Sequence, residues 1–184
     1  MNFIEVYDDA LTSEQCKLII DYMNSKELMP GAVGMDQRIS PETKESLDLS
    51  MNLNQETEVD CIIIDSLFEQ RNKYVKKHPF LDTELKLWNV RAGYNLQKYL
   101  PNKGYYKNHC ENVGGSSVVR VLAWMFYLNT ITDGGGTYFT DYDLTMNAIE
   151  GRCVIWPAFF THTHRGIVSK TETKYIATGW FQYI

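Results

Sequence analysis

The sequence predicts a mainly β protein with N-terminal helices (α+β), in which the helices pack on one outer face of a sandwich or jelly roll. Apolar residues in the first half recur at helical spacing, whereas from Leu87 onward short apolar runs alternate with turn residues. The 184 residues are 44% hydrophobic, which suits one core. We therefore expect a single domain, 1–184, with helical support over about 1–86 and a β core over about 87–184.

The first half predicts two helices separated by a loop. Thr12 and Gln15 form a capping box ahead of a helix from about Ser13 to Asn24. Its buried face would consist of Cys16, Ile19, Ile20 and Met23. Residues 31–48 are rich in Gly, Pro and charge, so we expect a loop there.

A second helix is expected to start near Asn54 and to end before Pro79. Its apolar positions follow helical spacing: Val59, Ile62, Ile63, Leu67 and Tyr74.

The second half predicts about eight short strands. They lie near 94–100, 105–111, 119–129, 136–139, 144–148, 152–156, 162–168 and 174–183. Turn residues at 101–104 and 133–136 connect neighbouring strands. Short strands at such spacing are typical of sandwiches and jelly rolls.

The net charge and the spacing of the cysteines limit which binding partners and which cellular compartment are expected. The net charge of −5 argues against duplex DNA or an anionic membrane, so a nucleic-acid partner is not expected. The four cysteines form no C-x-x-C pair, as in a reduced cytoplasmic protein. The N-terminus predicts no secretion signal, and the densest apolar run, 61–64, is too short to span a bilayer. We expect a cytoplasmic protein with no membrane partner, and the sequence assigns no oligomeric state.

The triplet His109-Cys110-Glu111 is the main candidate for chemistry. In a strand, positions i and i+2 face the same side, so His109 and Glu111 would converge while Cys110 packs away from them. A second imidazole would come from His162 or His164, and strand parity does not choose between them. Two histidines and one carboxylate on one face are typical of non-haem Fe(II) oxygenases. The alternative interpretation is a solvated strand with a polar face.

Three further side chains could bind an acidic co-substrate. Lys174 starts the last predicted strand, where its ammonium could pair with a carboxylate in the barrel mouth. Tyr127 and Tyr99 could add hydroxyl donors. The alternatives are a solvated lysine and tyrosines that only pack in the core.

Together these residues resemble the Fe(II)- and 2-oxoglutarate-dependent oxygenases of the prolyl 4-hydroxylase type, as found in compact phage and bacterial members. The pattern covers roughly the last ninety residues. Residues 11–16 also resemble the opening helix of that family. The pieces of the pattern are Tyr99, 104–111, Arg120, 126–129, 134–139, 164–166, Lys174 and the strand through Trp180.

The resemblance implies a double-stranded β-helix with iron bound by His109, Glu111 and His164. His164 is selected because the family's basic residue follows the distal histidine by about ten positions, which matches Lys174. Lys174, Tyr127 and Tyr99 would bind 2-oxoglutarate. One departure is Glu111, because this group usually has Asp at the middle ligand.

The implied activity is hydroxylation of a C–H bond with dioxygen, releasing succinate and CO2, with ascorbate as an optional auxiliary. A prolyl residue in a peptide or protein is the first expected substrate, a free amino acid or small metabolite the second, and a nucleobase the third. Loops 31–48 and 112–117 would act as a lid, with Trp180, Trp156 and Met125 as an apolar wall. The alternatives are a catalytically silent jelly-roll binding or structural module, and a cupin-like metalloenzyme that does not use 2-oxoglutarate.

Overall fold

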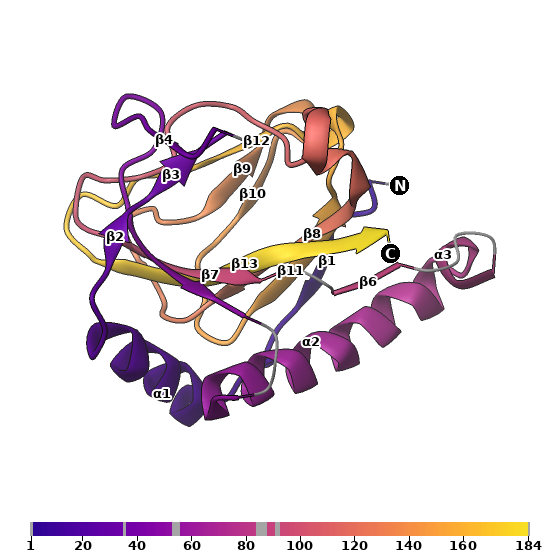
Figure 1. Cartoon of the computed structure of the whole chain (residues 1–184), viewed down its shortest axis with the longest axis horizontal. Coiled ribbons are helices and arrows are strands. Elements are labelled where there is room, and N and C mark those ends of the chain that lie inside the picture. The colour runs from indigo at the N-terminus through magenta and orange to yellow at the C-terminus, as the bar shows by residue number, and fades with distance from the viewer. Residues whose placement is uncertain (1, 35, 53–55, 84–87, 91–92, 184) are drawn as a thin grey trace.

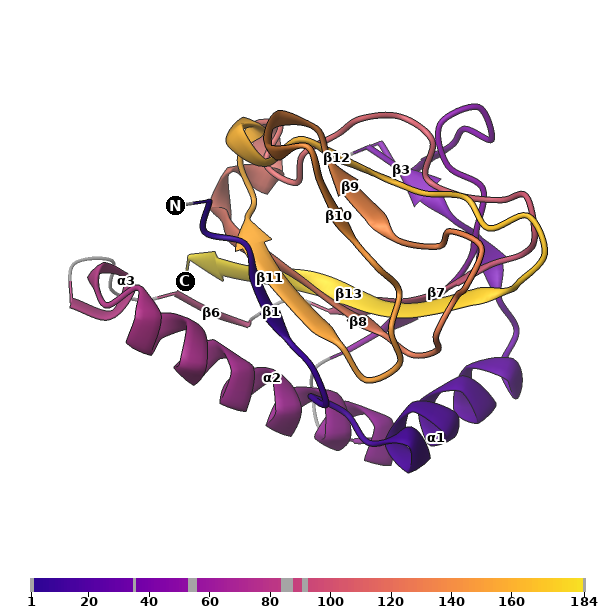
Figure 2. The same ribbon diagram turned by 180° about the vertical axis from the view of Figure 1, so that it is seen from behind.

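The computed structural model shows two β-sheets face to face, with helices along the outer face of the larger sheet (Figure 1). It describes residues 2–34, 36–52, 56–83, 88–90 and 93–183. The view from behind places the smaller sheet on the side opposite the helices as well (Figure 2). The fold is the predicted jelly roll with helices on one outer face. Within the described ranges, no helix is long and apolar enough to cross a membrane.

Two longer helices and one short helix support the large sheet. Helix α1 spans Ser13–Asn24, and the predicted capping box is present, because Thr12 accepts from the Gln15 N–H while the Gln15 side chain accepts from the Thr12 N–H. Helix α2 spans Glu58–Lys77 and is capped in the same way by Thr57, and α3 spans Phe80–Thr83. The expected α2 start near Asn54 and the 86/87 boundary between the halves lie outside the described residues.

The larger sheet contains eight described strands, all paired antiparallel. Their order is β1 (Glu5–Tyr7), β11 (Cys153–Pro157), β8 (Arg120–Tyr127), β13 (Lys174–Tyr183), β7 (Tyr94–Tyr99), β5 (Leu47–Met51) and β2 (Met29–Pro30), with β6 (Trp88–Val90) also on β13. The smaller sheet has the order β10 (Leu144–Met146), β9 (Thr137–Phe139) and β12 (His164–Gly166). A hairpin of β3 (Ala32–Val33) and β4 (Arg38–Ile39) lies apart from both.

Strand β8 is buried on both faces, which explains its continuous apolar run. Its alternate side chains Leu122, Trp124 and Phe126 pack toward α1 and α2, whereas Ala123, Met125 and Tyr127 pack between the two sheets. On β13, Gly179 pairs with Trp124, and a Cβ at Gly179 would lie 2.5 Å from the indole ring. Glycine is therefore required where the ring crosses the neighbouring strand.

Three expectations about local structure were wrong. The segment 31–48 is not only a loop, because it contains β3, β4 and the start of β5. Residues 105–111 form no strand; their backbone pairs through isolated bridges, of Tyr105 with Lys44 and of His109 with His164. His162 lies in a 3-10 helix, Phe160–His162, so it does not share a strand face with His164. A 3-10 turn also precedes β8 at Gly115–Val119.

Candidate metal centre

His109 and His164 are held side by side by their backbones. The His109 N–H donates to the His164 carbonyl and the His164 N–H to the His109 carbonyl, both at 2.9 Å. This reciprocal pair extends the smaller sheet by one bridge, and it brings the ring centroids to 4.4 Å. A single tertiary bridge therefore replaces the regular strand that was expected around His109.

Both imidazoles present Nε2 to the same point. The Nδ1 atom of His109 lies 3.0 Å from the Lys107 carbonyl, and that of His164 lies 2.8 Å from the His162 carbonyl. A carbonyl only accepts, so each Nδ1 carries the proton and each Nε2 keeps a free lone pair. This is the tautomer that a metal ligand requires.

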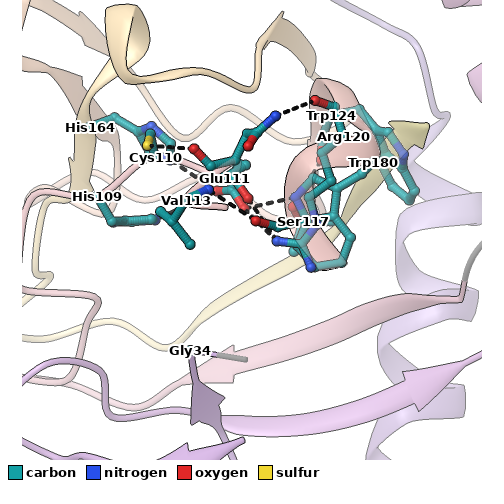
Figure 3. A network of polar contacts seen from close by, with 12 residues as sticks. Gly34, His109, Cys110, Glu111, Val113, Ser117, Arg120, Trp124, His164 and Trp180 are labelled. Atoms are coloured by element: carbon teal, nitrogen blue, oxygen red, sulfur yellow. Dashed lines mark hydrogen bonds and ion pairs between the residues drawn. The ribbon is translucent and has the colours of Figure 1, made fainter. Parts of the chain in front are cut away.

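Glu111 completes the set although it is not on a strand. Its Oε1 lies 3.6 Å from Nε2 of His109 and 3.4 Å from Nε2 of His164. The Glu111 N–H donates to the Ala158 carbonyl at 3.0 Å, which fixes the backbone beside β11. Figure 3 shows Glu111 between the two histidines on one side and Arg120 with Trp180 on the other.

The three donor atoms fit a metal ion. One ligand atom from each of His109, Glu111 and His164 lies within 4.8 Å of the others. Two neutral imidazoles and one carboxylate suit a divalent transition metal, and three protein ligands leave positions for other ligands. The side chains of His109 and Glu111 are 19% and 16% exposed, and that of His164 is 6% exposed.

The electrostatics favour the protonation states that bind metal. Burial, followed by the neighbouring His164, lowers the pKa of His109 to about 4, so its imidazole is neutral at neutral pH. Burial by itself would raise the pKa of Glu111, but the neighbouring imidazoles of His164 and His109 and the hydrogen bond from Trp180 together lower it to about 2. Glu111 is therefore an ionised ligand.

The candidate metal-ligand set, which consists of His109, Glu111 and His164, lies in a cavity of about 590 Å³. The cavity wall includes Lys174, Tyr99 and Thr137 from the strands, together with Trp156 and Met125. The hairpin residues Val33 and Gly34 and the loop residue Val113 also line it. Both segments that were expected to act as a lid thus border the cavity.

Lys174 is a buried cation in this cavity. It is 5% exposed, and its Nζ lies 4.7 Å from the centroid of the Tyr99 ring. Within the part of the chain that the structure describes, no carboxylate forms an ion pair with it. Burial lowers the pKa of Lys174 to about 8. An unpaired buried ammonium is costly, so this position favours an anionic ligand.

The two tyrosines take different positions. Tyr99 lines the cavity, and its hydroxyl donates to Oε1 of Gln97 at 2.8 Å. The Tyr127 hydroxyl instead lies 2.8 Å from Oγ1 of Thr137 and 3.3 Å from the Met146 carbonyl. Tyr127 therefore reaches the cavity through Thr137, whose side chain lies in the wall.

His162 is separated from the metal-ligand set. Its Nε2 lies 2.6 Å from the Asn2 carbonyl and its Nδ1 lies 2.9 Å from the Thr161 hydroxyl. It is 3% exposed, so it fastens the N-terminal segment to the loop before β12. Of the two histidines that parity left open, the structure brings only His164 to His109 and Glu111.

Three aromatic and cationic contacts at the site were not predicted. The Tyr105 ring stacks on His109 at 3.6 Å with an interplanar angle of 7°. Trp180 Nε1 donates to Oε2 of Glu111 at 2.7 Å, and the Arg120 guanidinium lies 3.6 Å from the Trp180 ring centroid. In the sequence, Arg120 is part of the family pattern and Trp180 is part of the expected apolar wall, but their contact was not predicted because it depends on the pairing of β8 with β13.

A second buried lysine, Lys44, forms an ion pair in the same cavity. Its Nζ lies 2.6 Å from Oδ2 of Asp48, and the two side chains are 4% and 13% exposed. Asp48 also accepts from the Ser46 hydroxyl at 2.7 Å and from Gln97 at 3.2 Å. The pair attaches the loop between β4 and β5 to strand β5 of the large sheet.

We expect Asp48→Asn to lower the free energy of unfolding by about 3 kcal/mol, because Lys44 would keep a buried charge without its partner. Denaturant unfolding would measure this. The control is Asp21→Asn, which breaks the exposed ion pair with Lys17. The side chain of Lys17 is 75% exposed and that of Asp21 is 62% exposed, so the free energy of unfolding should fall by less than about 1 kcal/mol. Equal losses in the two variants would contradict the expectation.

Residues 94–182 match the family described as the 2OG-Fe(II) oxygenase superfamily. The matched range contains His109, Glu111, His164 and Lys174. No curated protein sequence matches the chain.

Several solved structures share the fold. A viral collagen prolyl hydroxylase from Paramecium Bursaria Chlorella virus-1, solved as a 2OG complex, has 18% identity and a TM-score of 0.71, with 100% of this chain and 97% of that chain covered. A Pseudomonas putida prolyl-4-hydroxylase has 15% identity and a TM-score of 0.73, with coverages of 99% and 94%. A Trichoplax adhaerens prolyl hydroxylase, in complex with a hypoxia inducible factor peptide fragment, has 14% identity and a TM-score of 0.78, with coverages of 100% and 84%. At these identities the likeness establishes the jelly-roll fold.

Proposed function

Because residues 94–182 match the model of the 2OG-Fe(II) oxygenase superfamily, we propose that this chain is an Fe(II)- and 2-oxoglutarate-dependent dioxygenase that hydroxylates a prolyl residue in a peptide or protein. The products would be succinate, CO2 and the hydroxylated substrate. The observation that carries the proposal is the His109–Glu111–His164 set in a cavity that also contains the buried cation Lys174.

Each side chain has a distinct part in this proposal. His109, Glu111 and His164 would hold Fe(II) on one face, through two Nε2 atoms and one carboxylate oxygen. Bound iron supplies the redox chemistry that couples dioxygen to the decarboxylation of 2-oxoglutarate. Lys174, beside Tyr99, would pair with the carboxylate of 2-oxoglutarate that is far from the metal. Tyr127 would support the same carboxylate through Thr137.

The apolar part of the cavity would orient the substrate and exclude water. Trp156 and Met125 line it from the large sheet, and Val33 and Val113 line it from the two flanking segments. A peptide is the favoured substrate because the Trichoplax relative is in complex with a peptide fragment. A free amino acid or small metabolite is the second candidate.

We also propose that residues 1–184 act as one domain, since α1, α2 and the large sheet share a hydrophobic cluster. Cys16, Cys110 and Cys153 are free thiols, which supports a cytoplasmic location. The viral relative is compatible with a phage or bacterial source. The family match does not favour the alternatives of a catalytically silent binding module or a metalloenzyme that does not use 2-oxoglutarate.

Anaerobic titration with Fe(II) and 2-oxoglutarate tests the function directly. We expect the weak visible metal-to-ligand charge-transfer band that arises when a 2-oxo acid chelates ferrous iron, and we expect succinate once dioxygen is admitted. The matched control is His109→Ala, which should give neither signal. A folded protein that gives no band and no succinate would contradict the proposal. A band without succinate would show that the protein binds Fe(II) and 2-oxoglutarate but would contradict the proposed activity.

A further inference from the structure

The two oxygens of the Glu111 carboxylate have different partners. Oε1 faces the Nε2 atoms of His109 and His164 at 3.6 and 3.4 Å. Oε2 accepts the indole N–H of Trp180 at 2.7 Å, on the opposite side of the carboxylate (Figure 3). The hydrogen bond occupies a lone pair of Oε2 and holds that oxygen away from the imidazoles, so Oε1 is the oxygen that faces the metal position.

Trp180 is itself held in place from two sides. On β13 it pairs with Ala123 of β8, and a register shift follows it between Phe181 and Gln182. The Arg120 guanidinium lies over its ring at 3.6 Å. Arg120 also donates to the Glu111 carbonyl at 2.9 Å, so Arg120, Trp180 and Glu111 form a closed set of contacts.

This set explains how a glutamate serves at a position where the resembled group has aspartate. Glu has one more methylene than Asp and therefore one more rotatable bond that must be fixed before the carboxylate can act as a ligand. The indole N–H fixes it, because it holds Oε2 on the side away from the imidazoles while Oε1 faces them. Partners of this kind orient metal ligands and tune their affinity.

We propose that Trp180 is a positioning residue that directs Glu111 to bind metal through Oε1 alone, with Arg120 holding the indole in place. The inference rests on the proposed metal site. Single-oxygen ligation leaves coordination positions open for a chelating co-substrate, which ligation by both oxygens would reduce. Because Glu111→Asp draws the carboxylate one methylene closer to the backbone, we expect it to lose simultaneous contact with the imidazoles and the indole, so Trp180 should matter only in the Glu111 protein.

A double-mutant cycle with Mn(II) as the probe tests this, because Mn(II) binding can be measured by calorimetry without turnover. We expect Trp180→Phe to weaken Mn(II) binding about 10-fold in the Glu111 protein. In the Glu111→Asp background the same substitution should change the affinity by less than about twofold. Equal losses in both backgrounds, or no loss in the Glu111 protein, would overturn the proposal.

Two further variants separate this effect from unfolding. Trp88→Phe is the matched control: it also removes an indole hydrogen bond of 2.7 Å, to the Leu81 carbonyl, but Trp88 lies on β6 and packs against Phe181. It should leave Mn(II) affinity unchanged. If Trp180→Phe does not fold, Trp180→Leu replaces it in the cycle and should weaken binding only in the Glu111 protein. If His109→Ala still binds Mn(II) with normal affinity, the metal site itself is refuted. If His109→Ala loses Mn(II) binding but Trp180→Phe leaves Mn(II) affinity unchanged, only the role of Trp180 is refuted.

Discussion

His164→Ala is expected to lower 2-oxoglutarate-dependent turnover roughly 1000-fold, because it removes one of three metal ligands and metal-assisted stabilisation amounts to several kcal/mol. The His164 Nε2 lies 3.4 Å from Oε1 of Glu111, and its Nδ1 is already satisfied by the His162 carbonyl at 2.8 Å. The substitution therefore removes a donor that is aimed at the metal position. Succinate release at saturating Fe(II) would measure the loss.

The control for this variant is His162→Ala, two residues earlier. His162 has the same side chain, is equally buried, and bonds to Asn2 and Thr161 rather than to the metal-ligand set. We expect it to lose stability, by about 1–3 kcal/mol for the unsatisfied partners, and to retain turnover when assayed well below its melting temperature. A His162→Ala protein as inactive as His164→Ala would contradict the assignment of the distal ligand.

The choice between His162 and His164 could not be made from local sequence alone. Both positions fell in one predicted strand, and strand parity treats them as equivalent. In the structure the strand begins at His164, because residues 160–162 form a 3-10 turn and the peptide of His164 bonds to His109 instead. Only the resemblance, through the spacing to Lys174, distinguished them. Local periodicity cannot detect a bridge between residues fifty-five positions apart.

Elements with strong local signals were predicted well. Helix α1 has the expected bounds, since its capping box and apolar spacing lie within one short segment. Strand β13 spans Lys174–Tyr183 as expected, because a long apolar run bounded by turn residues is hard to mistake. The segment from Tyr105 to Glu111 was wrongly predicted as a strand, since its polar alternation resembled one while its backbone is held by separate bridges, to Lys44 in a loop and to His164 in β12.

Contacts that depend on strand register could not be predicted from the sequence. The hydrogen bond from Trp180 to Glu111 requires β13 to pair with β8 in one particular register, and the stacking of Arg120 requires the same register. Neither residue type nor spacing encodes that pairing. The chemistry of the site was therefore predictable from the residues that would bind the metal, whereas the residues that would orient them were not.

Lys174→Ala is expected to weaken 2-oxoglutarate binding about 30-fold, which corresponds to the roughly 2 kcal/mol or more that a buried charge partner contributes. Mn(II) affinity should persist, because Lys174 is not among the three donors that lie within 4.8 Å of one another. Calorimetric titration of the metal-free protein with Mn(II), followed by titration of the Mn(II)-loaded protein with 2-oxoglutarate, measures both constants. Loss of Mn(II) binding, or unchanged 2-oxoglutarate affinity, would contradict the role of Lys174.

The pH profile separates the charge of Lys174 from its bulk. Burial lowers the pKa of Lys174 to about 8, so the ammonium is mostly protonated at pH 7 and is lost as the pH rises through that value. A ligand that requires the charged form should therefore bind about 10-fold more weakly at pH 9 than at pH 7. Lys174→Arg keeps its charge over this range, and its affinity should be flat with pH even if it is lower. A wild-type profile as flat as that of Lys174→Arg would mean that the buried ammonium does not contact the co-substrate.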